Sequence, residues 1–196
     1  MMDEHDILGA ALQQFAGLTP EEFALSEGCW QYREFKKGEF YNEYKNVCKY
    51  LGFIIEGVFR TYYVDDRSDE EKNVFFFSQH QIVVSFQSFI AQAPCNYYTQ
   101  SMTASKILYI HIDDLQKLYT KSHGWERLGR RIAETAFSMA IRRTEDFLFL
   151  SPEQRYLDLM SQHPTIFNSI PLYHISSYLG IQSPSLSRIR KRLVGR

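Results

Sequence analysis

The sequence predicts an α+β fold: an antiparallel β-roll, then a long helix, then a C-terminal helix-turn-helix. Three observations lead to this prediction. Short aromatic and β-branched runs crowd the stretch from Trp30 to Ile112, an apolar seam of helical spacing follows, and two short amphipathic segments meet at Gly180. With 196 residues and 44% hydrophobic composition, the chain can bury one moderate core and one small core. The expected divisions of the chain are 1–118, 119–150 and 151–196.

The first part of the chain, residues 4–27, is expected to form short helices. Thr19, Pro20 and Glu22 make a helix start, because threonine can cap the free amides, proline fits the first helical position and glutamate stands three residues after the cap. The pattern changes at Trp30, where helical spacing gives way to strand-like runs.

Seven runs of aromatic and β-branched residues are the predicted strands. They are WQYREF (30–35), YLGFIIE (50–56), VFRTYYV (58–64), KNVFFF (72–77), QIVV (81–84), YYTQSM (97–102) and KILYIHI (106–112). Glycines and the acidic loop 65–71 separate them, and one or two helical turns are expected at 86–92. Several short strands without long helices between them indicate an antiparallel roll or barrel.

A long helix is predicted after Asp113 and Asp114, and the break at Ser151-Pro152 ends it before a further helix over 153–163. Its apolar seam covers roughly 25 residues, or about 40 Å of helix. Such a helix is longer than one small roll needs, which favours pairing with a second copy; the alternative is a helix packed on its own β-domain. Arg143 interrupts the seam. The positions expected at the dimer interface are Trp125, Leu128, Ile132, Ala136, Met139 and Phe147.

The segment from Leu172 to Leu193 predicts a helix-turn-helix. Its apolar residues recur at spacings of three and four on both sides of Gly180, so two amphipathic helices can share one small core. Glycine tolerates the positive φ just past a helix end, and Ser183 before Pro184 is a capped start for the second helix. This spacing is typical of paired helices that bind DNA.

The second of these helices turns its polar residues outward. Arg188 is placed for bidentate contact with guanine in the major groove, whereas the serines and later cations suit the DNA backbone. The DNA-binding residues predicted here are Ser183, Ser185, Ser187, Arg188, Lys191 and Arg192. From Pro152 onward the net charge is +4, while the preceding part carries −5, so only this end suits DNA electrostatically. The alternative is a basic terminal helix with a solvated charged face.

No catalytic, cofactor or metal site is expected. Cys29, Cys48 and Cys95 are widely spaced and form no C-x-x-C pair, and the histidines show no H-x-H or H-E-x-x-H spacing. The chain also lacks G-x-S-x-G and glycine-rich phosphate loops. No apolar run reaches the roughly 18 residues of a membrane span and the start has no signal sequence, so we expect a cytoplasmic protein without membrane contact.

The order of these parts resembles the cyclic-AMP receptor protein and fumarate-nitrate regulator (Crp/Fnr) family of bacterial transcription factors. The resemblance covers nearly the whole chain and is carried by FKKGEF (35–40), CKYLGFIIEGVFRTYY (48–63) and SSYLGIQSPSLSRIRKRL (176–193). It implies a sensory, cyclic-nucleotide-binding-like roll (a cupin-like double-stranded β-helix), a dimerisation helix over 119–150 and a winged-helix-like DNA-binding domain. The family's base-reading arginine falls on Arg188, whereas Ser183 and Pro184 replace its arginine and glutamate.

The ligand pocket departs from the family's cyclic-nucleotide binders. Val84-Ser85 stands where they have Gly-Glu, and Cys95-Asn96 where they have Arg-Ser. A phosphate site without its arginine loses its strongest charge-assisted contact, so cyclic AMP is not the expected effector. The cysteine cluster of the iron-sulfur members is also absent from the sequence. The expected pocket residues are Ser85, Phe86, Gln87, Cys95, Asn96 and Tyr97.

The expected function is a homodimeric transcriptional regulator that reads a palindromic operator in double-stranded DNA and needs no cofactor. RNA polymerase and an unidentified small-molecule effector are further candidate partners. The alternative is a module whose roll binds a small molecule or a protein, with DNA binding secondary. Aromatic residues such as Phe75 and Phe77 could line a ligand cavity or simply fill the roll, and the sequence does not separate these two arrangements.

Overall fold

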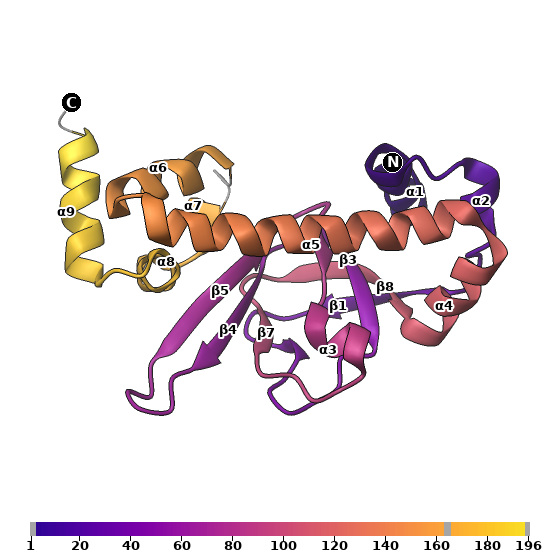
Figure 1. The fold of residues 1–196 in the computed structure, drawn as a ribbon, viewed down its shortest axis with the longest axis horizontal. Coiled ribbons are helices and arrows are strands. Elements are labelled where there is room, and N and C mark those ends of the chain that lie inside the picture. The colour runs from indigo at the N-terminus through magenta and orange to yellow at the C-terminus, as the bar shows by residue number, and fades with distance from the viewer. Residues whose placement is uncertain (1–2, 163–165, 195–196) are drawn as a thin grey trace.

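The computed structural model describes residues 3–162 and 166–194. It arranges them as a β-roll with helices at one end, a long helix that runs beside the roll, and a helical domain at the other end (Figure 1). This is the predicted order of parts, and the α+β fold class is confirmed.

The roll consists of two antiparallel sheets of four strands each. One has the order β1-β8-β3-β6 and the other the order β2-β7-β4-β5. The strands are β1 (Trp30–Phe35), β2 (Phe40–Asn42), β3 (Tyr50–Glu56), β4 (Phe59–Val64), β5 (Glu71–Phe77), β6 (Ile82–Val83), β7 (Tyr98–Ser101) and β8 (Ser105–His111). All seven predicted strands are present, with ends that differ by at most one residue. Strand β2 was not predicted, because it is three residues long and its pairing with β7 is irregular.

Helices close one end of the roll. They are α1 (Glu4–Ala16), α2 (Pro20–Ala24), α3 (Phe86–Ala91), α4 (Ile112–Lys121) and α5 (His123–Phe149). The predicted capping box is confirmed, since Thr19 Oγ1 accepts from the Glu22 amide at 3.2 Å and the Glu22 carboxylate accepts from the Thr19 amide at 3.1 Å. Ser122, in an extended conformation with φ −152°, separates α4 from α5 and caps α5, so the long helix begins at His123 and not at 119.

The first part of the predicted dimer seam is core of the same chain. Trp125, Leu128 and Ile132 are at most 7% exposed and pack with α1, α4 and the inner face of the roll. The Trp125 indole also donates to the Glu22 carbonyl of α2 at 2.8 Å. Placing these three side chains at a dimer interface was therefore wrong, because apolar spacing on a helix does not say which chain covers it.

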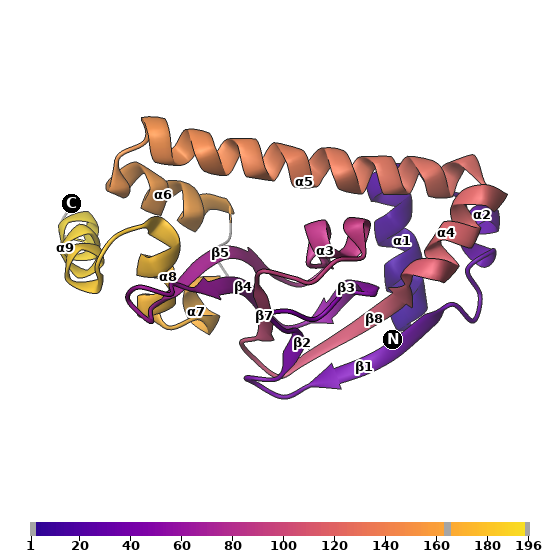
Figure 2. The same cartoon turned by 60° about the horizontal axis from the view of Figure 1, so that its bottom comes forward.

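Four helices form the C-terminal domain among its described residues, which contain no strand. They are α6 (Pro152–Gln162), α7 (Ile166–Ser169), α8 (Leu172–Leu179) and α9 (Ser183–Val194). Helix α7 was not predicted. The domain's core includes Ile175, Leu179 and Leu186, and it continues into Val58 and Phe76 of the roll. In Figure 2, α8 lies against β5 at the end of the roll away from α1. One hydrophobic cluster therefore spans both domains, while the roll keeps two further clusters of its own.

No helix in the described part of the chain combines the length and apolarity needed to cross a membrane.

Two glycines allow a matched test of turn packing in the roll. Gly57 (φ +107°) and Gly38 (φ +90°) both have backbones that disfavour a side chain, but a Cβ at Gly57 would lie 2.0 Å from Ser105 Oγ, whereas Gly38 has open space around it. Gly38→Ala should lower the free energy of unfolding by about 1–3 kcal/mol through backbone strain alone. Gly57→Ala should lower it further, because Ser105 must also move. Urea unfolding measures both, and equal losses would contradict the packing described here.

Candidate functional sites

The corner of the helix-turn-helix has the geometry that glycine provides. Gly180 has φ +67°, and its amide donates to the carbonyls of Ser176 and Ser177, while the Ile181 amide also bonds to the Ser176 carbonyl at 3.0 Å. These bonds satisfy the last carbonyls of α8. A Cβ on Gly180 would come within 2.6 Å of the Phe147 ring of α5, so the corner also packs closely on the long helix.

A serine pair holds the two helices of the motif together. Ser176 is 3% exposed, and its hydroxyl lies 3.0 Å from the Ser183 hydroxyl at the start of α9. Helix α9 begins at Ser183, one residue earlier than predicted, because the Gln182 carbonyl accepts from the Ser185 and Leu186 amides. The Ser183 hydroxyl therefore bonds to Ser176 of α8, and Ser183 is not the cap of α9 that the sequence predicted.

The outer face of α9 carries the predicted base reader. Arg188 and Lys191 are exposed, and the Arg188 guanidinium contacts only Ser185 Oγ, at 3.1 Å, among the described residues. Ser187 is also exposed and donates to the Ser183 carbonyl at 3.1 Å. Arg192 differs, because it forms an ion pair with Glu153 of α6. All three predicted cations are exposed, and Arg188 and Lys191 are the two that form no ion pair among the described residues.

The second half of the predicted seam contacts the helix-turn-helix of its own chain. Arg143 donates to the Tyr178 carbonyl, and its guanidinium lies 3.7 Å from the centre of the Tyr178 ring and 4.4 Å from that of Phe147. Arg155 lies over the other side of Phe147 and donates to the Leu179 carbonyl at 3.2 Å. Arg143, which interrupts the apolar seam, therefore joins α5 to α8. Phe147 packs against Gly180 at the corner of the helix-turn-helix.

A polar cluster with a buried centre fixes α8 on the roll. We refer to Arg60, Glu71, Asn73, His174 and Ser177 as the interdomain cluster. The Arg60 guanidinium, on a side chain 4% exposed, donates to His174 Nδ1 at 2.8 Å and forms an ion pair with Glu71. Ser177 Oγ accepts from the Asn73 amide at 3.1 Å and donates to the Glu71 carbonyl at 2.8 Å. The hydroxyl of α8 thus satisfies two backbone groups on the open edge of β5.

His174 is neutral in this cluster. A guanidinium has no acceptor, so Nδ1 must accept the Arg60 hydrogen bond through its lone pair. Burial, and next the positive charge of Arg60, lower the pKa of His174 to about 4, while Glu71 acts in the opposite direction.

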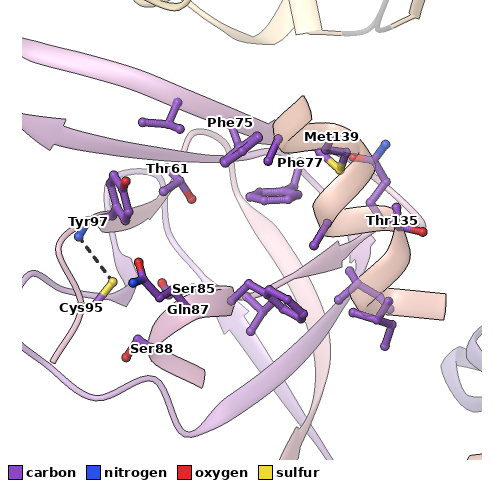
Figure 3. A pocket seen from close by; sticks show the side chains of 18 of the residues that line it. Thr61, Phe75, Phe77, Ser85, Gln87, Ser88, Cys95, Tyr97, Thr135 and Met139 are labelled. Carbon is purple, nitrogen blue, oxygen red and sulfur yellow. Dashed lines mark hydrogen bonds between the residues drawn. The ribbon is translucent and has the colours of Figure 1, made fainter. Parts of the chain in front are cut away.

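A cavity of about 590 Å³ opens between the roll, α3 and α5. All six predicted pocket residues line it, together with Ala136 and Met139 of the predicted seam (Figure 3). Ser85 and Cys95 are buried, whereas Gln87 and Asn96 are exposed at its rim. The roll is therefore hollow beside α5, which the sequence alone left open.

No family model and no curated protein sequence matches this chain. Solved structures do match over most of its length. FixK2 from Bradyrhizobium japonicum has a TM-score of 0.73 at 12% identity, over 85% of each chain. A putative transcriptional regulator of the Crp/Fnr family from Eubacterium rectale has a TM-score of 0.70 at 16% identity, over 91% of this chain and 85% of that one. The c-di-GMP-responsive global regulator CLP from Xanthomonas campestris has a TM-score of 0.66 at 15% identity, over 90% and 92%.

The chain has the fold of the Crp/Fnr regulators. The resemblance inferred from the sequence is confirmed at the level of the fold, and two of the compared proteins are described as regulators, one of them as a putative transcriptional regulator of the Crp/Fnr family. The described residues include no cluster of three His, Cys, Asp or Glu side chains that could hold a metal ion. The interdomain cluster was not predicted, since its residues on the roll and its residues on α8 are more than 100 positions apart in the chain and no local pattern joins them.

Acidification should weaken the docking of α8. Between pH 6.5 and about 4 the His174 imidazole binds a proton in the unfolded chain but not in the folded one. The contribution of neutral His174 to the free energy of unfolding is therefore complete above pH 6.5 and is lost as the pH falls toward 4. The loss should approach about 3 kcal/mol at pH 4, at 1.36 kcal/mol for each pKa unit. Urea unfolding from pH 7.5 to 4.5 measures it. His174→Gln, which keeps an acceptor for Arg60 but does not titrate there, should show a flatter profile than the parent.

His123→Gln is the matched control, because the His123 side chain is almost fully exposed at the start of α5. The free energy of unfolding of His123→Gln should change with pH as that of the parent does. Identical profiles for the parent and His174→Gln would exclude His174 as the titrating group.

Proposed function

We propose that the chain is a homodimeric transcriptional regulator that reads palindromic double-stranded DNA through α9 and responds to an effector in the roll cavity. The single observation that carries this proposal is the outer face of α9. There Arg188 and Lys191 project to solvent from a helix-turn-helix whose inner residues, Leu186 and Ile189, are at most 8% exposed. A guanidinium one turn into such a helix can donate two hydrogen bonds to a guanine edge.

An exposed apolar stripe on α5 supports the dimer. Phe137, Ile141 and Leu148 are 68%, 44% and 70% exposed, and with Thr144 they follow spacings of four, three and four. We call these four residues the outer stripe. The spacing is that of a coiled-coil seam, which keeps one face of a helix toward a partner helix. We place the dimer interface on the outer stripe, because the first half of the expected seam is buried in the same chain. In the second half, Met139 and Phe147 are 38% and 45% exposed, but Met139 lines the cavity and Phe147 packs under two arginines of its own chain.

Pairing along α5 would bring two α9 helices to one DNA duplex. A dimer of this kind meets two half-sites about 34 Å apart, one helical turn of DNA. RNA polymerase is a further proposed partner, in line with the role of a transcriptional regulator.

Arg188→Ala is expected to remove discrimination at one base pair of each half-site and to weaken specific binding by about 1–3 kcal/mol per contact. Binding-site selection on random duplexes, followed by fluorescence anisotropy with the selected operator, measures both effects. An unchanged consensus sequence for the variant would show that Arg188 reads no base.

Lys191→Ala should instead weaken all duplexes alike, because an ammonium on the DNA backbone carries no sequence information. The slope of log affinity against log salt should fall by about one unit for the lost phosphate contact. A change of consensus in this variant, with an unchanged salt slope, would reverse the roles assigned to the two residues.

Ile141→Asp should dissociate the dimer at micromolar concentration and weaken operator binding, because the charge would enter the outer stripe without a partner. Ser138→Asp, on an exposed neighbouring position outside the stripe, is the control and should leave the mass unchanged. Sedimentation equilibrium measures the mass, and circular dichroism shows that both variants remain folded. A dimeric Ile141→Asp variant would place the interface elsewhere.

A further inference from the structure

The roll cavity has no carboxylate, ammonium or guanidinium in its described wall. Among the described residues that line it, none is Asp, Glu, Lys or Arg, and the histidine that lines it, His80, is exposed and stacks on Phe53 with ring centres 6.1 Å apart. The nearby cations of the roll have other partners: Arg60 lies in the interdomain cluster, Lys72 pairs with Glu70 and Lys106 pairs with Glu56. An anion buried here would exchange water for neutral groups, which is strongly unfavourable.

Most of the wall is apolar, and its apolar residues come from helices α1, α3 and α5 and from several strands, β5 among them. Phe75 and Phe77 of β5 lie with their ring centres 6.2 Å apart, and Phe86 of α3 and Met139 of α5 also line the cavity. Figure 3 shows Phe77 and Met139 on one side of the cavity and Cys95, Tyr97 and Ser85 on the other. Aromatic rings and a thioether side chain suit an apolar or aromatic body.

Several of the polar groups in the wall already have partners. Ser85 Oγ lies 3.2 Å from Thr99 Oγ1, which also bonds to Thr61 Oγ1 at 3.1 Å. Ser88 Oγ accepts from the Cys48 amide and donates to the Ala93 carbonyl. By contrast, no hydrogen bond within the described residues engages the side-chain amides of Gln87 and Asn96 at the rim. These two amides are left to bind a polar group of a ligand.

We infer that the cavity takes an uncharged, mainly apolar molecule of drug-like size, whose body packs on Phe75, Phe77 and Met139 and whose polar end meets Gln87 and Asn96. The volume of about 590 Å³ falls in the range of small-molecule sites. This inference deepens the proposed function by naming the chemical class of the effector, and it rests on that function for the effect on DNA. Binding of the molecule in the cavity does not depend on the proposed DNA-binding function.

The test uses the full chain and neutral probes. 1-Aminoanthracene, which is uncharged at pH 7, should bind with saturable fluorescence enhancement. Competitors are matched pairs, 2-naphthylmethanol against 2-naphthoate and 1-decanol against decanoate, with cyclic AMP as a further anion. The neutral member of each pair should displace the probe at least about tenfold better than the carboxylate, because the carboxylate must lose its hydration without a cation. Cyclic AMP should not displace it at tens of micromolar.

Two variants separate this site from binding elsewhere. Ala136→Trp places a large side chain in the cavity from α5 and should abolish probe binding, with circular dichroism and mass as checks of folding and assembly. Gln87→Lys adds a cation at the exposed rim and should reduce the preference for the neutral competitors, whereas Gln79→Lys, exposed and outside the lining, should not.

Equal displacement by both members of each pair, or no probe binding at any concentration up to solubility, would overturn the inference. Operator binding is measured separately: probe binding without DNA binding would contradict only the proposed function, and DNA binding without probe binding would contradict only the inference about the cavity.

Discussion

The contact between α8 and the edge strand β5 determines where α9, the helix proposed to read DNA, lies relative to the roll. A sheet edge exposes unpaired amides and carbonyls, and Ser177 satisfies two of those on β5 with one hydroxyl. Beside it, Arg60 and His174 form a buried hydrogen bond that closes the junction, and Phe76 packs on Tyr178 with ring centres 5.1 Å apart. Because α9 is attached to α8 through a glycine corner, this junction sets the position of Arg188 relative to the roll.

Helix α5 joins every other part of the molecule. Its first turns complete the core of the roll, its middle turns form one wall of the cavity, and its last turns hold the corner of the helix-turn-helix through Arg143 and Phe147. The opposite face carries the outer stripe. A molecule in the cavity would therefore touch the same rigid helix that contacts α8 and, in the proposed dimer, the partner. One helix in contact with both sites is the kind of two-sided element through which ligand binding can bias DNA binding.

The polar residues of the cavity differ from those that the Crp/Fnr resemblance implies for a cyclic-nucleotide site. Ser85 and Cys95 stand where the cyclic-nucleotide binders of the Crp/Fnr family are expected to have charged residues, and here both are buried. Their hydrogen bonds go to Thr99 and to the Tyr97 amide, so they stabilise the wall rather than receive an anion. Among the described residues, the buried cation is Arg60, which points to the other face of the sheet and contributes to the junction with α8.

The sequence by itself determined the local elements, because strand alternation, the capping box and the glycine corner depend on residues close together in the chain. It placed seven strands within one residue and both helices of the helix-turn-helix. Only the tertiary structure decided which chain covers each face of α5, since Trp125 is apolar whether its own roll or a partner buries it. It also decided that the roll is hollow and that Arg60 meets His174, because these outcomes depend on packing between segments far apart in the sequence.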